Sequence, residues 1–138
     1  MKKSKKKKGA LIMIVIEEKN EIEKYYEEDT DTYVFDDDVT FGCNVFVSGN
    51  IHAIGDIETT GVIGCMGNIF GNNIQAKEII TGLIRARTIT TDRLMARTIK
   101  ANDIYIGNAK ISGYINDLKI FENTNNQKGV NKNGKYNN

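Results

Sequence analysis

The sequence of 138 residues contains no proline and no tryptophan, and it has only two cysteines and one histidine. This length suits one domain with tails, and its 40% of hydrophobic residues can form a core. Because aromatic residues are few, we expect that core to be narrow and aliphatic. Cys43 and Cys65 stand in no metal-ligand spacing and follow no convincing secretory signal, so we predict reduced thiols in a cytoplasmic protein. We expect no metal and no cofactor.

Long hydrophobic runs are also lacking. The apolar run at 10–16 has seven residues, whereas a membrane-spanning helix needs about 20. It follows six lysines within the first eight residues, and each lysine near an anionic membrane contributes about 1 kcal/mol. Two interpretations stay open: contact with the inner face of the cell membrane, or a solvated basic tail leading into a buried strand. The residues predicted to touch a membrane are Lys2, Lys3, Lys5, Lys6, Lys7, Lys8, Leu11, Ile12, Met13 and Ile14. We do not expect nucleic acid as a partner, because no aromatic residues alternate with these lysines.

The central part of the chain contains a ladder of large aliphatic residues. They recur every six residues up to position 69 and every five residues after it. Between positions 39 and 104 there are 18 valines, isoleucines and leucines, and the ladder takes 13 of them. Its members are Val39, Val45, Ile51, Ile57, Ile63, Ile69, Ile74, Ile79, Ile84, Ile89, Leu94, Ile99 and Ile104.

This spacing excludes a helix and a single flat sheet. A step of five would scatter the residues around a helix, and it would alternate the two faces of an extended strand. The remaining solution is a chain in which a short strand is followed by a corner, and this unit of strand and corner repeats. Smaller residues two positions after each ladder residue point the same way in a strand and would fill the interior beside it. Gly49, Gly55, Gly61 and Gly67 recur shortly before ladder residues, where we expect corners that need positive φ. The fold class is therefore all-β, a single-stranded parallel β-helix (β-solenoid) with five- and six-residue faces.

The segments "GNIHAIGDIETTGVIG" and "DIYIGNAKISGYI" resemble the bactofilins, polymer-forming cytoskeletal proteins of bacteria. The resemblance covers roughly 39–120 and implies a three-sided, right-handed β-helix that self-assembles. The five-residue section is also similar to pentapeptide-repeat proteins, which form four-sided solenoids. Those place the small residue before the large one, whereas this chain has Ile74 before Ala76. The number of sides therefore remains open from the sequence.

Composition divides the chain into four parts. Residues 1–16 form a basic and apolar tail, and residues 17–38 form a linker or cap with eleven acids against two lysines. Residues 39–121 form the solenoid, and residues 122–138, with seven asparagines, are predicted to be disordered.

Catalysis is not expected. Hexapeptide β-helix acyltransferases need a general base, usually histidine, and related carbonic anhydrases use three histidines on zinc. Here only His52 is present, at an outward position, and no phosphate-binding glycine loop or Ser, His, Asp constellation stands out. We predict a protein that is not an enzyme.

Two binding functions remain. A solenoid leaves unpaired strand edges at its ends, and these can pair with further copies into filaments that need no nucleotide. The predicted contact residues are Val39, Phe41, Val45, Val47, Ile111, Ile115, Leu118, Ile120 and Phe121. The alternative is a solenoid that does not polymerise and binds an acidic protein or polyanion through a basic face at 77–100. Its residues are Lys77, Arg85, Arg87, Arg93, Arg97 and Lys100, of which Lys77, Arg87 and Arg97 share one repeat position and can stack into a stripe.

Overall fold

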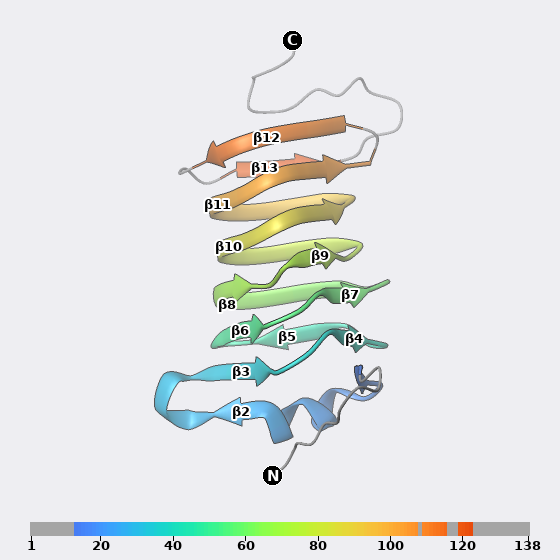
Figure 1. Cartoon of the computed structure of the whole chain (residues 1–138), viewed down its shortest axis with the longest axis vertical. Helices are drawn as coiled ribbons and strands as arrows, with labels where there is room; N and C mark the ends of the chain where they lie inside the picture. Colours follow the sequence, from blue (N-terminus) through green and yellow to red (C-terminus); the bar gives the residue numbers. More distant parts are fainter. Residues whose placement is uncertain (1–12, 108, 116–118, 123–138) are drawn as a thin grey trace.

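The computed structural model describes residues 13–107, 109–115 and 119–122, with side chains described for 13–107. It is a parallel β-solenoid of about five coils (Figure 1), as the ladder predicts. Two short 3-10 helices lie at its N-terminal end, η1 (Lys19–Tyr25) and η2 (Glu28–Thr30). The strands are β1 (Ile14–Ile16), β2 (Tyr26–Glu27), β3 (Thr32–Phe35), β4 (Val39–Phe41), β5 (Val45–Val47), β6 (Asn50–Ala53), β7 (Ile57–Thr59), β8 (Val62–Phe70), β9 (Asn73–Gln75), β10 (Glu78–Thr91), β11 (Arg93–Ile106), β12 (Ala109–Ile115) and β13 (Lys119–Glu122).

Strand pairing shows that each coil has three faces. Val39 pairs with Ile57, the third ladder residue after it, so three six-residue steps complete a coil in this section. Further along, Ile74 pairs with Ile89, which is again three ladder steps, but here they are five-residue steps. The coil therefore shortens by one residue at each of three corners. This settles the number of sides that the sequence left open.

The ladder residues divide among these faces. Face 1 contains Ile14, Val39, Ile57, Ile74, Ile89 and Ile104. Face 2 contains Val45, Ile63, Ile79 and Leu94. Face 3 contains Tyr33, Ile51, Ile69, Ile84 and Ile99. All thirteen predicted ladder residues are buried, and nine of them are completely inaccessible to solvent. Burying a side chain of this size stabilises the fold by about 1.5–3 kcal/mol.

The sheet begins before residue 39. β1 pairs with β4 in parallel register, so Ile14 lies opposite Val39 and Ile16 lies opposite Phe41. Part of the acidic segment also belongs to the solenoid, because β3 pairs with β6 on face 3. On face 2 the first coil has η1 in place of a strand, with Ile22 buried against the core. The predicted start of the solenoid at residue 39 is thus too late.

The last coil runs in the opposite direction. Gly107 has a φ of 61°, a left-handed conformation that glycine adopts without steric cost. After it, β12 pairs antiparallel with β11, and β13 also pairs antiparallel with β11. The parallel winding therefore ends at Ile106, and the predicted solenoid to residue 121 is completed by a reversed coil.

The corners are held by side chains that reach from one coil to the next. In the six-residue section, Oδ1 of Asp38, Asn44 and Asn50 accepts a backbone N–H of the next coil, at distances of 2.8–2.9 Å. In the five-residue section, the Thr81 and Thr91 hydroxyls donate to backbone carbonyls of the preceding coil at 3.0 Å. These side chains thus provide hydrogen-bond partners for backbone N–H and carbonyl groups at the corners, which would otherwise be buried without one.

The recurrent glycines serve these corners in a different way from the one predicted. Among the described residues, Gly107 is the glycine with positive φ, so Gly49 does not adopt it, nor do the other three, Gly55, Gly61 and Gly67. A Cβ atom at each of those three positions would instead overlap the Oδ1 atom of the Asx side chain from the preceding coil. Glycine is required there because the corner side chain occupies the space.

We expect Gly61→Ala to lower the free energy of unfolding by about 1–3 kcal/mol, the usual cost of overpacking. The nearest atoms to the new methyl group belong to the side chains of Asn44 and Thr59. In an Asn44→Ala background the same change should cost clearly less, since the overlapping oxygen is gone. Urea denaturation of the four proteins gives the coupling energy. Equal costs in the two backgrounds would contradict the role assigned to Gly61.

Candidate interaction surfaces

The first candidate surface is the N-terminal end of the rod. Val39 and Phe41 were predicted to form a joint there, but both are 1% exposed, and β4 has strands on both sides. Val45 is also buried. The prediction fails for these residues because β1 and η1 add an earlier layer. The end is formed instead by β1, η1 and β2, with Tyr25 packed on Phe35 at 4.9 Å between ring centroids.

Within the described residues, β1 has an open edge at this end. Its partner in the described sheet is β4, and the Ile14 N–H and the Ile16 carbonyl both bond toward that side. Backbone groups of successive strand residues point to opposite edges, so the N–H and carbonyl of Val15 face away from β4.

The C-terminal end has open edges as well. β12 and β13 each pair with β11 on one side, and no strand of the described chain pairs with their other sides. Ile111 and Ile115 lie on β12, and Ile120 and Phe121 lie on β13, so these four predicted contact residues belong to the terminal strands. Leu118 lies outside the described residues.

The predicted membrane contact is only partly within the structure. Lys2, Lys3, Lys5, Lys6, Lys7, Lys8, Leu11 and Ile12 lie outside the described residues. Met13 is 52% exposed, while Ile14 is partly buried in β1 and packs on the core. Ile14 is therefore a solenoid residue, and its contact with a membrane stays a prediction. Among the described residues, no helix has the length and apolar character needed to pass through a bilayer.

The six residues of the predicted basic face do not share one face. Residues of neighbouring coils stack when they are three ladder steps apart, as Arg85 and Lys100 do on face 3. Lys77, Arg87 and Arg97 are two ladder steps apart, so they lie at three different corners and form no stripe. Arg93 lies above Glu78 and forms a salt bridge with it. These three residues do share one position of the repeat, as predicted. Whether such residues stack depends on the number of residues in a coil, which could not be read from the sequence.

A shallow groove of about 640 Å³ lies beside face 3 and contains part of the basic set. Arg85, Arg87 and Asn72 lie on one part of its lining, with His52 and Phe70 beside them. The His52 and Phe70 rings meet edge to face, with centroids 5.6 Å apart. Two guanidinium groups in one groove attract an anion, and the binding alternative depends on this arrangement.

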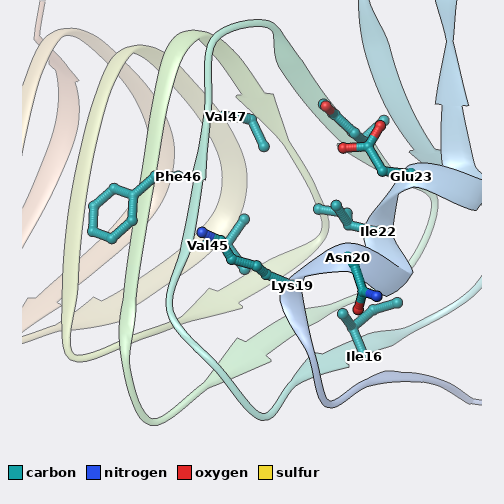
Figure 2. A pocket seen from close by; sticks show the side chains of 9 residues that line it. Ile16, Lys19, Asn20, Ile22, Glu23, Val45, Phe46 and Val47 are labelled. Carbon is teal, nitrogen blue, oxygen red and sulfur yellow. The ribbon is translucent and has the colours of Figure 1, made fainter.

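A second groove, of about 410 Å³, lies between η1 and β5. Figure 2 shows Ile16 and Ile22 on one side of it and Val45 and Val47 on the other, while Phe46 points away. Lys19 and Glu23 stand at its rim. The groove is largely apolar and is covered by η1. The predicted contact residues Val45 and Val47 line this groove and do not form an end surface of the rod.

Neither cysteine is poised for chemistry. Cys65 is 4% exposed, and its thiol contacts the Gly49 carbonyl oxygen at 2.9 Å. Burial raises the pKa of the Cys65 thiol, and it also raises the pKa of Cys43, which is less enclosed. A raised pKa reduces the thiolate that a nucleophile or metal ligand needs. In the part of the chain that the structure describes, no three His, Cys, Asp or Glu side chains gather closely enough to hold a metal ion.

The three most exposed of the described apolar side chains were not predicted from the sequence. Met66 is 78% exposed, Ile54 is 67% exposed and Phe46 is 60% exposed. Their exposure could have been predicted from their position in the repeat, because all three are large apolar residues outside its inward positions. Ile54 and Met66 occupy corners on either side of face 3.

Comparison of the chain with protein-family models, curated proteins and solved structures found no match. The interaction surfaces therefore rest on the geometry and charges described above.

Proposed function

We propose that this chain is a structural protein similar to the bactofilins, which assembles end to end into filaments without nucleotide. The observation that supports this function is the open backbone edge at both ends of the described sheet, β1 at one end and β12 with β13 at the other. Unpaired strand edges favour pairing with another chain. An end-to-end contact that does not close produces a filament.

The joint in this proposal differs from the one expected from sequence. At the N-terminal end it uses the edge of β1 in place of Val39 and Phe41. At the C-terminal end it uses β12 and β13, which contain Ile111, Ile115, Ile120 and Phe121. The lysine block at 2–8 would attach such filaments to the anionic inner face of the cell membrane.

Val15→Pro tests the joint. Proline removes an N–H that faces the open edge and leaves the bonds from Ile14 and Ile16 to β4 in place. We expect the parent chain and a Val15→Thr control to form filaments in negative-stain electron microscopy without nucleotide. The Val15→Pro variant should stop at small particles with the same circular dichroism spectrum.

Uniform small particles from the parent chain at high concentration would contradict the filament proposal. They would leave the second candidate, an anion-binding module that uses the Arg85 and Arg87 groove. Binding of an acidic polymer that falls steeply with salt would then favour that function.

A further inference from the structure

One column of outward residues runs along face 3 on five successive strands. Val34 lies beside His52, His52 beside Phe70, Phe70 beside Arg85, and Arg85 beside Lys100. Phe70 is the middle residue of the five. Among these five strands, two lie on each side of Phe70, and the sheet continues to β2 beyond β3 and to β12 beyond β11.

Charge changes sign along this face. Around β3, at one end, the exposed acids are Glu27, Glu28, Asp29, Asp31, Asp36 and Asp38. At the other end the exposed cations are Arg85, Arg87, Arg97 and Lys100. Among the residues with described side chains, Asp103 is an acid at that end, and both Asp103 and Lys100 already have an interaction within their own chain. Between the two ends lie Phe70 and the exposed apolar side chains of Ile54 and Met66.

A surface that is acidic at one end, apolar in the middle and basic at the other end is complementary to itself when it is turned end over end. We propose that face 3 binds face 3 of a second copy, antiparallel, about a two-fold axis that lies between the two faces, parallel to the strands and level with Phe70. Two-fold contacts of this kind use one patch on both copies. A parallel arrangement would place acid against acid and base against base.

The two-fold operation predicts specific neighbours. It reverses the rod and keeps the strand direction, because the axis runs along the strands. The corner before β3 therefore meets the partner's corner before Ile99. Asp31 then faces the partner's Arg97, and Ile54 faces the partner's Arg87. At the centre Phe70 faces Phe70 of the other copy, and two sheets packed face to face lie about 10 Å apart.

The contact is small. Five strands at about 4.8 Å span about 24 Å, and a face of about 15 Å in width gives about 350 Å² per copy. The total of about 700 Å² is below the roughly 1,200 Å² of stable complexes. Isolated pairs should thus be weak and sensitive to salt, whereas pairing between filaments would act through many copies at once. This surface is separate from the ends used in the proposed function.

A cross-link at the centre of face 3 tests the pairing. Phe70→Cys, made in a Cys43→Ser and Val15→Pro chain, is treated with a short bis-maleimide. The matched control is Gln75→Cys in the same chain, an exposed outward residue on face 1. We expect covalent dimers from position 70, rising with protein concentration and falling with salt, and none above background from position 75. Because Val15→Pro blocks the β1 edge, this result does not depend on filament assembly.

A charge exchange tests the orientation in the same cross-linking assay. The acid-end variant carries Glu28→Lys and Asp29→Lys, beside Asp31, and the basic-end variant carries Arg87→Glu and Arg97→Glu. Each variant alone should lose about tenfold or more of the position 70 dimer, because like charges then face each other in both halves of the contact. A mixture of the two variants should recover it as heterodimers.

Equal cross-linking at positions 70 and 75, or no recovery in the mixture, would overturn the proposal. Absence of the position 70 dimer together with binding of polyglutamate to the Arg85 and Arg87 groove would overturn it as well. That outcome would assign the basic end to a foreign acidic partner.

Discussion

Replacing Ile84 by alanine is expected to lower the free energy of unfolding by about 2–5 kcal/mol, the usual range for such a truncation in a core. Ile84 is completely buried on face 3, between Ile69 and Ile99 of the neighbouring coils. The backbone on all three sides of the coil is fixed by strand pairing, so the surroundings have little freedom to fill the cavity. Urea denaturation followed by circular dichroism measures the loss.

The adjacent residue provides the control for this prediction. Arg85 points outward from the same strand and is exposed, so Arg85→Ala should change stability by no more than about 0.5 kcal/mol. Coils of a solenoid contact mainly their neighbours, so unfolding can begin at one end. For that reason the comparison needs coincident transitions from two probes. Similar losses for Ile84→Ala and Arg85→Ala would contradict the inward and outward assignment.

Replacing the six lysines of residues 2–8 by glutamine is expected to abolish binding to anionic vesicles. At about 1 kcal/mol for each lysine the loss is about 6 kcal/mol, or about four orders of magnitude in affinity. The structure strengthens the electrostatic part of this expectation. Of the four apolar residues predicted to touch the membrane, Ile14 belongs to β1 and is partly buried, so fewer apolar residues are free to enter the bilayer than the sequence suggested.

Vesicle co-sedimentation checks this expectation. The parent chain should bind vesicles that contain anionic lipid, and increasing salt should release it. Neutral vesicles and the glutamine variant serve as controls. Binding of the parent to neutral vesicles, or binding that is insensitive to salt, would show that apolar insertion dominates and would contradict the prediction.

The core could be predicted from sequence because the repeat encodes it directly. Each inward position of a strand repeats after every corner, so the ladder from Val39 to Ile104 identifies buried residues without knowledge of the pairing. The coil shape required more. Whether five-residue steps close into three or four sides depends on which residues pair, and Ile74 with Ile89 gives that answer only in three dimensions.

The two ends could not be predicted for a different reason. At the N-terminus, η1 and η2 separate Ile14 and Ile16 from the first ladder residue, so no fixed spacing connects them to Val39. At the C-terminus, the left-handed conformation of Gly107 reverses the chain, and the reversed strands still place Ile111 opposite Ile104. Spacing alone does not distinguish a forward coil from a reversed one.

The candidate surfaces were predicted less well than the core. The number of residues in a coil decides on which face or corner a charged residue lies. Lys77, Arg87 and Arg97 are two ladder steps apart, and they are known to lie at different corners only because a coil closes after three steps. The polarity of face 3 was also hidden, because its acids, aromatic ring and cations come from segments that are distant in sequence.

The change from six-residue to five-residue steps makes the rod a taper, with a wide end near β4 and a narrow end near β11. When such rods are joined head to tail, every joint places a narrow perimeter against a wide one. The width of the resulting fibre would therefore vary periodically along its axis. The fibre would show two axial periodicities, the spacing between strands and the length of one whole molecule.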